Sequence, residues 1–469
     1  MRFKVSPALL LVFGVARAFA DDPTEAQLKE QDQRIKILER KLELQEEAAG
    51  GAASSNAVGK ATAGGFVLQS ADGKNVIKWR GNFQLDGRWF SDQSTPNTAN
   101  TWLLRRVRPY IEGTLNGDYD FRLMPEFAGG KAIILDAYVA ARLRPWAVIQ
   151  AGKFKGPVGL ERLQPDQYTR FLELALPSSL VPNRDLGLQF SGAVLQGTVS
   201  YAVGYFDGVV DGASTDGNAP TNDVDNDGKK DIEARIFVQP FLASDHFYLR
   251  GLGVGIAGTT VNSTGSVTNT LLPSYRTPGQ QPLFSYRANS ATGTAPNNAA
   301  YADGDRTRWS PQAYYYAGSL GVIGEYARVS QDVSRQLNAT TKSSATLSHS
   351  AWQIAAAYFV TGEEATYASF TPGNTFAIGK PGWGALEIVL RYHRLNIYAE
   401  AFADGANSFA DPASQPSAAR AIGAGVNWYL NQNVKWQFNY ERTQFTGGAA
   451  GGADRPHENA ILTRFALAF

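Results

Sequence analysis

Arginine and lysine side chains recur at alternate positions along several segments of the sequence, where they could bind an anion. Alternate residues of an extended strand point to one face, so such residues would form a row of positive charges. Arginine offers phosphate oxygens a planar fork, whereas lysine offers a point charge. The residues placed on one face are Lys78, Arg80, Arg88, Arg106, Arg108, Arg122 and Arg142. Lys153 and Lys155 end a later strand, and the segment after them carries Arg162, Arg170 and Arg184. These five, together with Arg80, Arg88, Arg106, Arg108 and Arg122, are the ten residues that we predict to bind the anion.

Acidic residues on the same faces leave a second interpretation open. The seven basic residues share their face with Asp86, Glu112, Asp120, Glu126 and Asp136, which leaves a net charge of +2. The range 156–185 combines its three arginines with four carboxylates, a net charge of −1. The basic side chains could therefore brace a wall through ion pairs instead of binding a solute.

An acidic stretch is a candidate site for structural calcium, with carboxylates at Asp223, Asp225, Asp227 and Asp231. Carboxylates at alternate positions followed by Gly228 resemble the start of a calcium loop. The twelfth position is Ala234, where an EF-hand has a bidentate glutamate, so the match is incomplete. The alternative is an acidic loop in solvent.

The composition argues against several other functions. The chain has no cysteine, which excludes disulfides, thiolate metal sites and cysteine nucleophiles. Its four histidines are far apart in sequence, and no motif places a serine beside one, so neither a hydrolase nor a zinc site is predicted. A formal net charge of +1 lacks the basic surplus of a nucleic-acid-binding protein. We predict no enzyme activity, no nucleic-acid partner and no cofactor apart from the candidate calcium.

The segments that carry the charges alternate between apolar and polar residues over long runs. From Ile77 to Phe90, aromatic, aliphatic and glycine residues occupy one face and polar residues the other. The ranges 105–115 and 119–127 repeat this pattern, with Val107 and Arg106 on opposite faces. Soluble strands usually extend over only about five or six residues. Long strands with one charged and one apolar, aromatic face are typical of outer-membrane β-barrels, with lipid outside and water inside.

Short and long connections alternate between these strands, as periplasmic turns and extracellular loops do. Short turns are predicted at 116–117, 145, 194–195, 318 and 431–432, and long loops at 156–185, 207–230, 259–307, 331–349 and 396–419. The stretch 361–382 is long although it falls on the turn side. The fold class is therefore all-β, a 16-stranded antiparallel transmembrane β-barrel with both chain ends in the periplasm.

The amino-terminal region predicts export and a short helix before the barrel. Residues 1–20 have the features of a signal peptide, with Arg2 and Lys4 before an apolar run and a small-residue cleavage site at Ala20.

Residues 21–49 predict a periplasmic helix with a heptad seam of Leu28, Gln31, Ile35, Leu38, Leu42 and Gln45. Such a short coiled coil would form only when several copies are held together, and the alternative is a solvated helix against the protein's own surface. Residues 50–65 predict a flexible linker, and residues 66–469 the barrel.

The final strand predicts outer-membrane insertion. Ile461, Phe465, Leu467 and the terminal Phe469 share the outward face, while Arg464 points inward. A chain that stops on an aromatic residue at the outer face of a strand resembles the recognition signal of outer-membrane barrels.

The sequence resembles the phosphate-selective porin O and P family through motifs spread over residues 66–469. These motifs are Arg105-Arg106-Val107-Arg108, Gly152-Lys153-Phe154-Lys155, Gly159-Leu160-Glu161, Ala175-Leu176-Pro177-Ser178, Arg184-Asp185-Leu186-Gly187, Thr361-Gly362-Glu363 and Gly382-Trp383-Gly384-Ala385-Leu386-Glu387. The resemblance implies a trimeric sixteen-stranded porin whose third loop, here 156–185, folds inward and narrows the channel. It also implies that members described as phosphate-selective line the passage with arginines and lysines.

The expected function is a passive channel in the outer membrane of a Gram-negative bacterium. Its leading solute would be phosphate, polyphosphate or a related small anion, and its other partners would be outer-membrane lipid and two further copies of the chain. One alternative is a porin of the same fold for other small anions or neutral nutrients. Another is an envelope-tethering protein that uses the barrel as an anchor.

Overall fold

The computed structural model describes residues 30–44, 57–62, 64–91, 99–130, 132–215, 223–225, 227–288, 298–338, 340–368 and 370–469. The predicted signal peptide and both ends of the predicted coiled coil lie outside these ranges. The chain divides into two units, one of Met1–Val58 with Ser70–Asp72 and one of Gly59–Gln69 with Gly73–Phe469.

The first unit contains a helix over residues 30–44 whose described residues are all exposed. Ion pairs one turn apart join Glu30 to Arg34 at 2.9 Å and Asp32 to Lys36 at 3.0 Å. Such exposed pairs contribute only about 0.3–0.5 kcal/mol each. The helix is confirmed, and its assembly into a coiled coil stays a prediction. In the described part of the chain, no helix is both long enough and apolar enough to cross a membrane.

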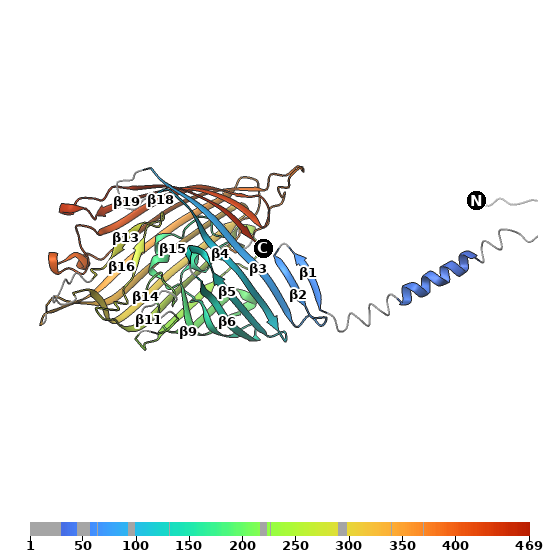
Figure 1. The fold of residues 1–469 in the computed structure, drawn as a ribbon, viewed down its shortest axis with the longest axis horizontal. Coiled ribbons are helices and arrows are strands. Elements are labelled where there is room, and N and C mark those ends of the chain that lie inside the picture. Colours follow the sequence, from blue (N-terminus) through green and yellow to red (C-terminus); the bar gives the residue numbers. More distant parts are fainter. Residues whose placement is uncertain are drawn as a thin grey trace, which may run out of the picture. The chain divides into compact units, whose positions relative to one another are not determined.

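Sixteen of the described strands form a closed antiparallel barrel, which confirms the predicted fold (Figure 1). Neighbours in sequence pair in order, and β20 closes the barrel against β3, with Ala460 opposite Phe90. The barrel strands are β3 (Val76–Phe90), β4 (Thr101–Leu115), β5 (Tyr119–Glu126), β6 (Ile133–Arg144), β7 (Ala147–Lys155), β8 (Arg184–Val194), β9 (Val199–Phe206), β10 (Asp231–Val238), β11 (Leu252–Thr264), β14 (Ala300–Ala317), β15 (Leu320–Gln336), β16 (Lys342–Phe359), β17 (Ala385–Asn396), β18 (Pro416–Tyr429), β19 (Val434–Gly447) and β20 (Glu458–Ala468).

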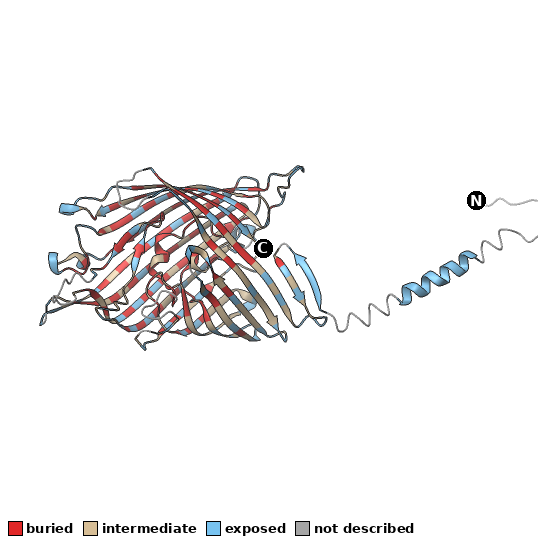
Figure 2. Cartoon of the chain, in the orientation of Figure 1, coloured by how far each residue is buried: buried red, intermediate tan, exposed pale blue. Residues whose placement is uncertain are grey.

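Burial alternates along these strands, as a wall between two different media requires (Figure 2). Apolar side chains such as Trp79 and Phe438 are exposed on the outer face, whereas charged side chains such as Asp86 and Arg464 are buried inside. This pattern confirms the predicted charged interior and apolar outer surface.

Two further strands precede the barrel, β1 (Val58–Thr62) and β2 (Gly65–Gln69). β2 pairs with β3 through Phe66 opposite Trp79, and β1 pairs with β2. The prediction of a flexible linker is therefore wrong for residues 58–62. β20 reaches only as far as Asn82 of β3, so the edge of β3 beyond that point has free backbone groups that β2 can bind.

Several loops differ in length from their predicted bounds because the strands continue further. The loop between β15 and β16 is only 337–341 rather than 331–349, and β11 and β14 both extend into the predicted loop 259–307. The outward-facing residues of these strand ends are polar, such as Thr260, Asp332 and Thr346, so the apolar outer face that marks the membrane-spanning part ends before the strands do. The rest of the 259–307 loop contains a hairpin, β12 (Ser274–Arg276) with β13 (Pro282–Ser285).

Short helical turns occupy many of the connections. They are η1 (Ala128–Gly130), α2 (Leu160–Leu163), η2 (Leu176–Leu180), η3 (Leu195–Gly197), α3 (Phe247–Arg250), η5 (Ala399–Phe402), η6 (Gly405–Asn407) and η7 (Ala450–Gly452). A buried apolar cluster joins Leu180 of η2 to Tyr275 and Phe284 of the β12–β13 hairpin and to Leu347 of β16. This cluster packs two connecting segments against the wall.

Candidate functional site

The third loop, residues 156–183 between β7 and β8, lies among inward-facing side chains of distant strands. Glu325 of β15 accepts a hydrogen bond from the Leu160 amide at 2.6 Å. Arg391 of β17 donates to the Glu173 carbonyl at 2.9 Å, and Arg464 of β20 donates to the Leu172 carbonyl at 2.6 Å. The contacts of this loop thus reach strands far around the wall from β7 and β8.

Two carboxylates of the third loop bind arginines of β3 and β4. Glu173 accepts from Arg88 and from Arg105, each at 2.6 Å. Asp166 contacts Arg108 and lies 3.5 Å from Arg106. Burial by itself would raise the pKa of both carboxyls, but the neighbouring arginines hold each pKa below its usual range, so both stay ionised at neutral pH.

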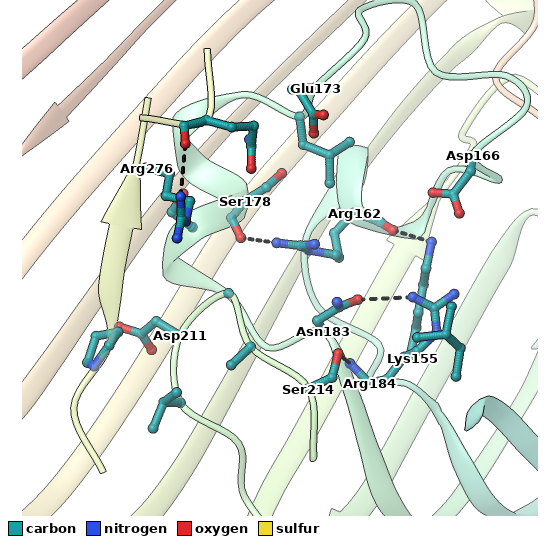
Figure 3. A pocket seen from close by; sticks show the side chains of 18 of the residues that line it. Lys155, Arg162, Asp166, Glu173, Ser178, Asn183, Arg184, Asp211, Ser214 and Arg276 are labelled. Carbon is teal, nitrogen blue, oxygen red and sulfur yellow. Dashed lines mark hydrogen bonds between the residues drawn. The ribbon is translucent and has the colours of Figure 1, made fainter. Parts of the chain in front are cut away.

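A cavity of about 530 Å³ lies beside the third loop, between β4, the segment 210–214 and the β12–β13 hairpin (Figure 3). Seven basic and four acidic side chains line it, a basic surplus. The basic residues are Arg105, Arg106, Arg108, Lys155, Arg162, Arg184 and Arg276, and the acidic ones are Glu126, Asp166, Glu173 and Asp211. We call this space the basic cavity.

Three of these cations, Lys155, Arg162 and Arg276, form no ion pair with any described residue. The Lys155 Nζ donates to the carbonyls of Arg162 and Gln164 at 2.8 and 3.1 Å, which uses two of its three hydrogens. Arg162 donates to the Ser178 carbonyl, and its buried Nε has no acceptor among the described residues. Burial lowers the pKa of Arg162 to about 10, and nearby Arg184 adds to the shift, so this side chain remains charged at neutral pH.

Arg276 approaches the basic cavity from β12 and donates to the Gln280 carbonyl at 2.9 Å. In Figure 3 it lies on the other side of the cavity from Lys155. The buried Ser178 Oγ also lines the cavity and has no hydrogen-bond partner in the part of the chain that the structure describes. The basic cavity therefore offers N–H and O–H donors whose acceptors are not supplied by the described chain.

Five of the ten predicted anion-binding residues line the basic cavity, namely Arg106, Arg108, Lys155, Arg162 and Arg184. Arg106 and Arg108 are held by Asp166, and Arg184 by Asp136 at 2.7 Å. Arg106 also donates to Gln84 at 2.5 Å. Their contact with a solute stays a prediction.

The other five predicted residues lie outside the basic cavity and are paired with carboxylates. Arg80 and Arg122 both bind Glu112, at 2.6 and 2.5 Å. Arg88 binds Glu173, Lys153 contacts Asp223, and Arg170 binds Glu387 at 2.9 Å. These pairs support the alternative left open by the sequence, in which the basic side chains stabilise the barrel wall through ion pairs instead of binding a solute.

The sequence prediction missed Arg105, which strict alternation would place outward beside Val107. In β4, Arg106 is opposite Gln84 and Leu104 is opposite Leu85, which leaves Arg105 as the extra residue of a β-bulge. The bulge allows Arg105 and Arg106 to line the cavity together. Two adjacent arginines in an alternating strand were the available signal. Arg276, the other missed residue, lies in a loop whose sequence carries no such signal.

Three of the four described carboxylates of the acidic stretch contact basic side chains, and the fourth, Asp227, accepts hydrogen bonds from the backbone amides of Lys229 and Thr264 at 3.0 and 2.9 Å. Asp223 contacts Lys153, and Asp225 contacts Lys230, which also lies 3.1 Å from Asp207. Hydrogen bonding to Asp225 raises the pKa of Lys230. Asp231 lies apart from the others and binds Arg308 at 2.9 Å. Among the described residues no three acidic or histidine side chains are grouped to hold a metal ion, and calcium binding stays a prediction.

Comparison with known proteins gives one family and a set of similar structures. The family described as phosphate-selective porin O and P matches residues 77–469. The outer membrane channel DcaP of Acinetobacter baumannii superimposes with a TM-score of 0.50 at 11% identity, over 84% of this chain and 97% of that chain. This similarity indicates a shared fold.

Two further structures have TM-scores of 0.49. They are Salmonella typhi OmpF in complex with daunomycin, at 13% identity over 84% of this chain and 98% of that chain, and the trimer form of Vibrio cholerae OmpT, at 12% identity over 84% and 99%. No curated protein matches the sequence significantly.

Proposed function

The chain belongs to the phosphate-selective porin O and P family and is located in the Gram-negative outer membrane, and on that premise we propose that it is a passive channel for small anions. Phosphate or polyphosphate is the leading solute. The observation that carries this proposal is the basic cavity, where Lys155, Arg162 and Arg276 lack a carboxylate partner among the described residues. A channel of this kind needs no catalytic group.

The donors of the basic cavity suit a phosphate ion that must exchange part of its hydration shell. One hydrogen of Lys155, the Nε of Arg162 and the hydroxyl of Ser178 can replace water around the phosphate oxygens. Conduction also requires that the ion leave again, so binding must be weak. Arginines that are already paired with carboxylates bind phosphate less strongly, because the carboxylate largely compensates their charge.

In this proposal the third loop narrows the passage. Its contacts with β15, β17 and β20 support a path across the lumen, and the β12–β13 hairpin supplies Arg276 from the other side. The proposal also includes a homotrimer surrounded by outer-membrane lipid.

Removing the unpaired cations tests the proposed selectivity. The variant Arg162→Ala with Arg276→Ala, in planar bilayers, should shift the reversal potential in a chloride gradient toward lower anion preference. Its apparent affinity for phosphate, measured as block of the chloride current, should fall by roughly tenfold, since a charge-assisted hydrogen bond contributes about 1.5–3 kcal/mol when dry and less in a wet pore.

The matched control removes two arginines from the exposed surface, Arg394→Ala with Arg420→Ala. Both reversal potential and phosphate block should then remain unchanged. If the Arg162 and Arg276 variant also kept its phosphate block, anion selectivity through the basic cavity would be excluded. Rapid swelling in neutral sugars of vesicles that contain the protein would then support the second candidate, a general nutrient porin. The pairing of the wall arginines with carboxylates favours this candidate.

A further inference from the structure

The long connection between β16 and β17, described over residues 360–368 and 370–384, passes from the inside of the barrel to its outside. On the inside, the ring of Phe370 stacks on that of Phe359 with centroids 4.4 Å apart. It also contacts Tyr429, whose hydroxyl donates to the inward-facing Glu387 at 2.9 Å. This half of the connection therefore belongs to the interior.

The second half of the connection lies against the outer face. The ring of Phe376 is 5.8 Å from that of Trp428, and the Trp428 indole donates to the Trp383 carbonyl at 2.5 Å. Trp428 follows the alternation of β18 to the outside, opposite in direction to Tyr429, and its ring stacks with that of Trp436 at 6.3 Å.

This outer segment lies at the end of the barrel where the chain terminates. The Phe376 amide donates to the Leu430 carbonyl in the β18–β19 turn, and the Ala468 amide donates to the Asn433 carbonyl in the same turn. Short turns occupy this end, so it is the periplasmic rim.

The outer segment presents apolar side chains that nothing in the described chain covers. Ile378 is 94% exposed and Trp383 is 77% exposed. Lys380, between them, is exposed and forms no ion pair with a described residue. Gly379 and Gly382, with φ of 77° and 146°, take backbone conformations that favour glycine, so the turn that presents these side chains is built into the sequence.

We propose that residues 375–383 form an interfacial anchor in the periplasmic leaflet of the outer membrane. Ile378 and Trp383 insert at the boundary between head groups and acyl chains, and Lys380 binds lipid phosphate. The segment is continuous with the lipid-facing surface, since exposed Leu386 of β17 is paired with Trp428. Tryptophan prefers the membrane interface, and a cation there is attracted to anionic lipid. The proposal requires the outer-membrane location and is independent of the solute that the channel passes.

Site-directed spin labelling can test this anchor in the full chain. The sequence has no cysteine, so Ile378→Cys gives a single labelling site. The labelled protein is reconstituted in vesicles of phosphatidylethanolamine and phosphatidylglycerol, and its collisions with oxygen and with a water-soluble nickel chelate are measured. We expect high oxygen and low nickel accessibility at position 378. The control Asp118→Cys, on the exposed β4–β5 turn of the same rim, should show the reverse.

A second variant tests the role of the lysine. In phosphatidylglycerol vesicles, adding Lys380→Glu to the labelled protein should lower the oxygen accessibility and raise the nickel accessibility at position 378. The change should be smaller in phosphatidylcholine vesicles. An equal shift in both compositions would overturn the binding of Lys380 to anionic lipid.

Two outcomes would overturn the anchor itself. In one, position 378 is as accessible to nickel as position 118, which means that the segment lies in water. In the other, both probes are excluded and the label shows spin–spin broadening, which means that a second copy of the chain covers the segment. Quenching of Trp383 by brominated lipid, measured as the difference between the native chain and Trp383→Phe, gives a result that does not depend on the label.

Discussion

A charged side chain in this barrel has a different role according to whether a carboxylate lies beside it. Arg464 is fully buried and binds both oxygens of Asp86 at 2.6 and 2.8 Å. Burying either ion alone would cost several kcal/mol, so such a pair is retained as a unit and braces two neighbouring strands. Lys155 and Arg162 make hydrogen bonds to carbonyls instead and form no ion pair with a described residue.

Asp166 controls how much positive charge Arg106 and Arg108 present to the basic cavity. Replacing it by Asn removes one negative charge at nearly constant volume. We expect Asp166→Asn to raise anion preference in reversal-potential measurements and to strengthen phosphate block by a few-fold. Arg106 then has no carboxylate partner among the described residues, and Arg108 keeps only Glu126, at 2.6 Å. Asp120→Asn is the matched control, since Asp120 pairs with Arg142 at 3.2 Å and lies outside the cavity. A fall in anion preference in Asp166→Asn would contradict the assigned role.

At the scale of elements, the third loop is fixed by ionised carboxylates as well as by backbone hydrogen bonds. Glu173 is the clearest case, since it binds Arg88 and Arg105 from two different strands. Burial opposes its ionisation, but the arginines outweigh burial and lower its pKa. The loop should therefore stay attached in mildly acidic solution.

The pH dependence of stability follows from this lowered pKa. A carboxyl whose pKa falls on folding stabilises the protein above its unfolded pKa and loses that contribution as the pH drops through its folded pKa. Glu173→Gln should therefore unfold at lower temperature than the native chain at pH 7, with a loss of about 3 kcal/mol. The difference should persist down to about pH 4, the ordinary carboxyl value, and disappear only below it. Its disappearance between pH 5 and pH 7 would show that the arginines do not hold Glu173 ionised.

The acidic loop after β9 gives a second prediction for an element. Lys153 and Lys230 already contact Asp223 and Asp225, so we expect a calcium chelator to leave the protease sensitivity of this loop unchanged. Limited proteolysis with and without chelator measures this. Faster cleavage after chelation would establish the calcium site that the sequence pattern suggested.

At the scale of the whole molecule, the amino-terminal helix and the barrel wall are separate candidates for holding the proposed trimer together. The helix exposes Ile35, Leu38 and Leu42 along one seam, which three copies could bury jointly. The β1–β2 hairpin has a different role, since it pairs with β3 of its own chain.

Deletion of residues 21–56 should leave a trimer that dissociates at lower temperature, as seen by electrophoresis after graded heating. This deletion keeps the β1–β2 hairpin, and deletion of 21–69 is the comparison that also exposes the edge of β3. If the shorter deletion yields only monomers, the helix rather than the wall maintains the assembly.

The sequence alone determined the sixteen strands and, apart from the bulge at Arg105, the side of the wall that their alternating side chains face. Alternation has a period of two residues, which is local information, and a lipid-facing surface requires it at nearly every position. The terminal Phe469 illustrates this, because its ring contacts those of Phe66 and Phe83 on the outer face, as its place in the final strand predicts.

Only the tertiary structure decided which charges are paired and which are available. The ion pairs join residues far apart in sequence, such as Arg464 with Asp86 and Arg391 with Glu161, and a few ångströms decide whether a cation is compensated. The bulge at Arg105 and the position of Arg276 in a folded hairpin also depend on packing between distant segments. The sequence shows where each charge lies along the chain. The electric field in the lumen is a sum over charges from the whole barrel, so only the three-dimensional contacts show which cations lack a carboxylate partner.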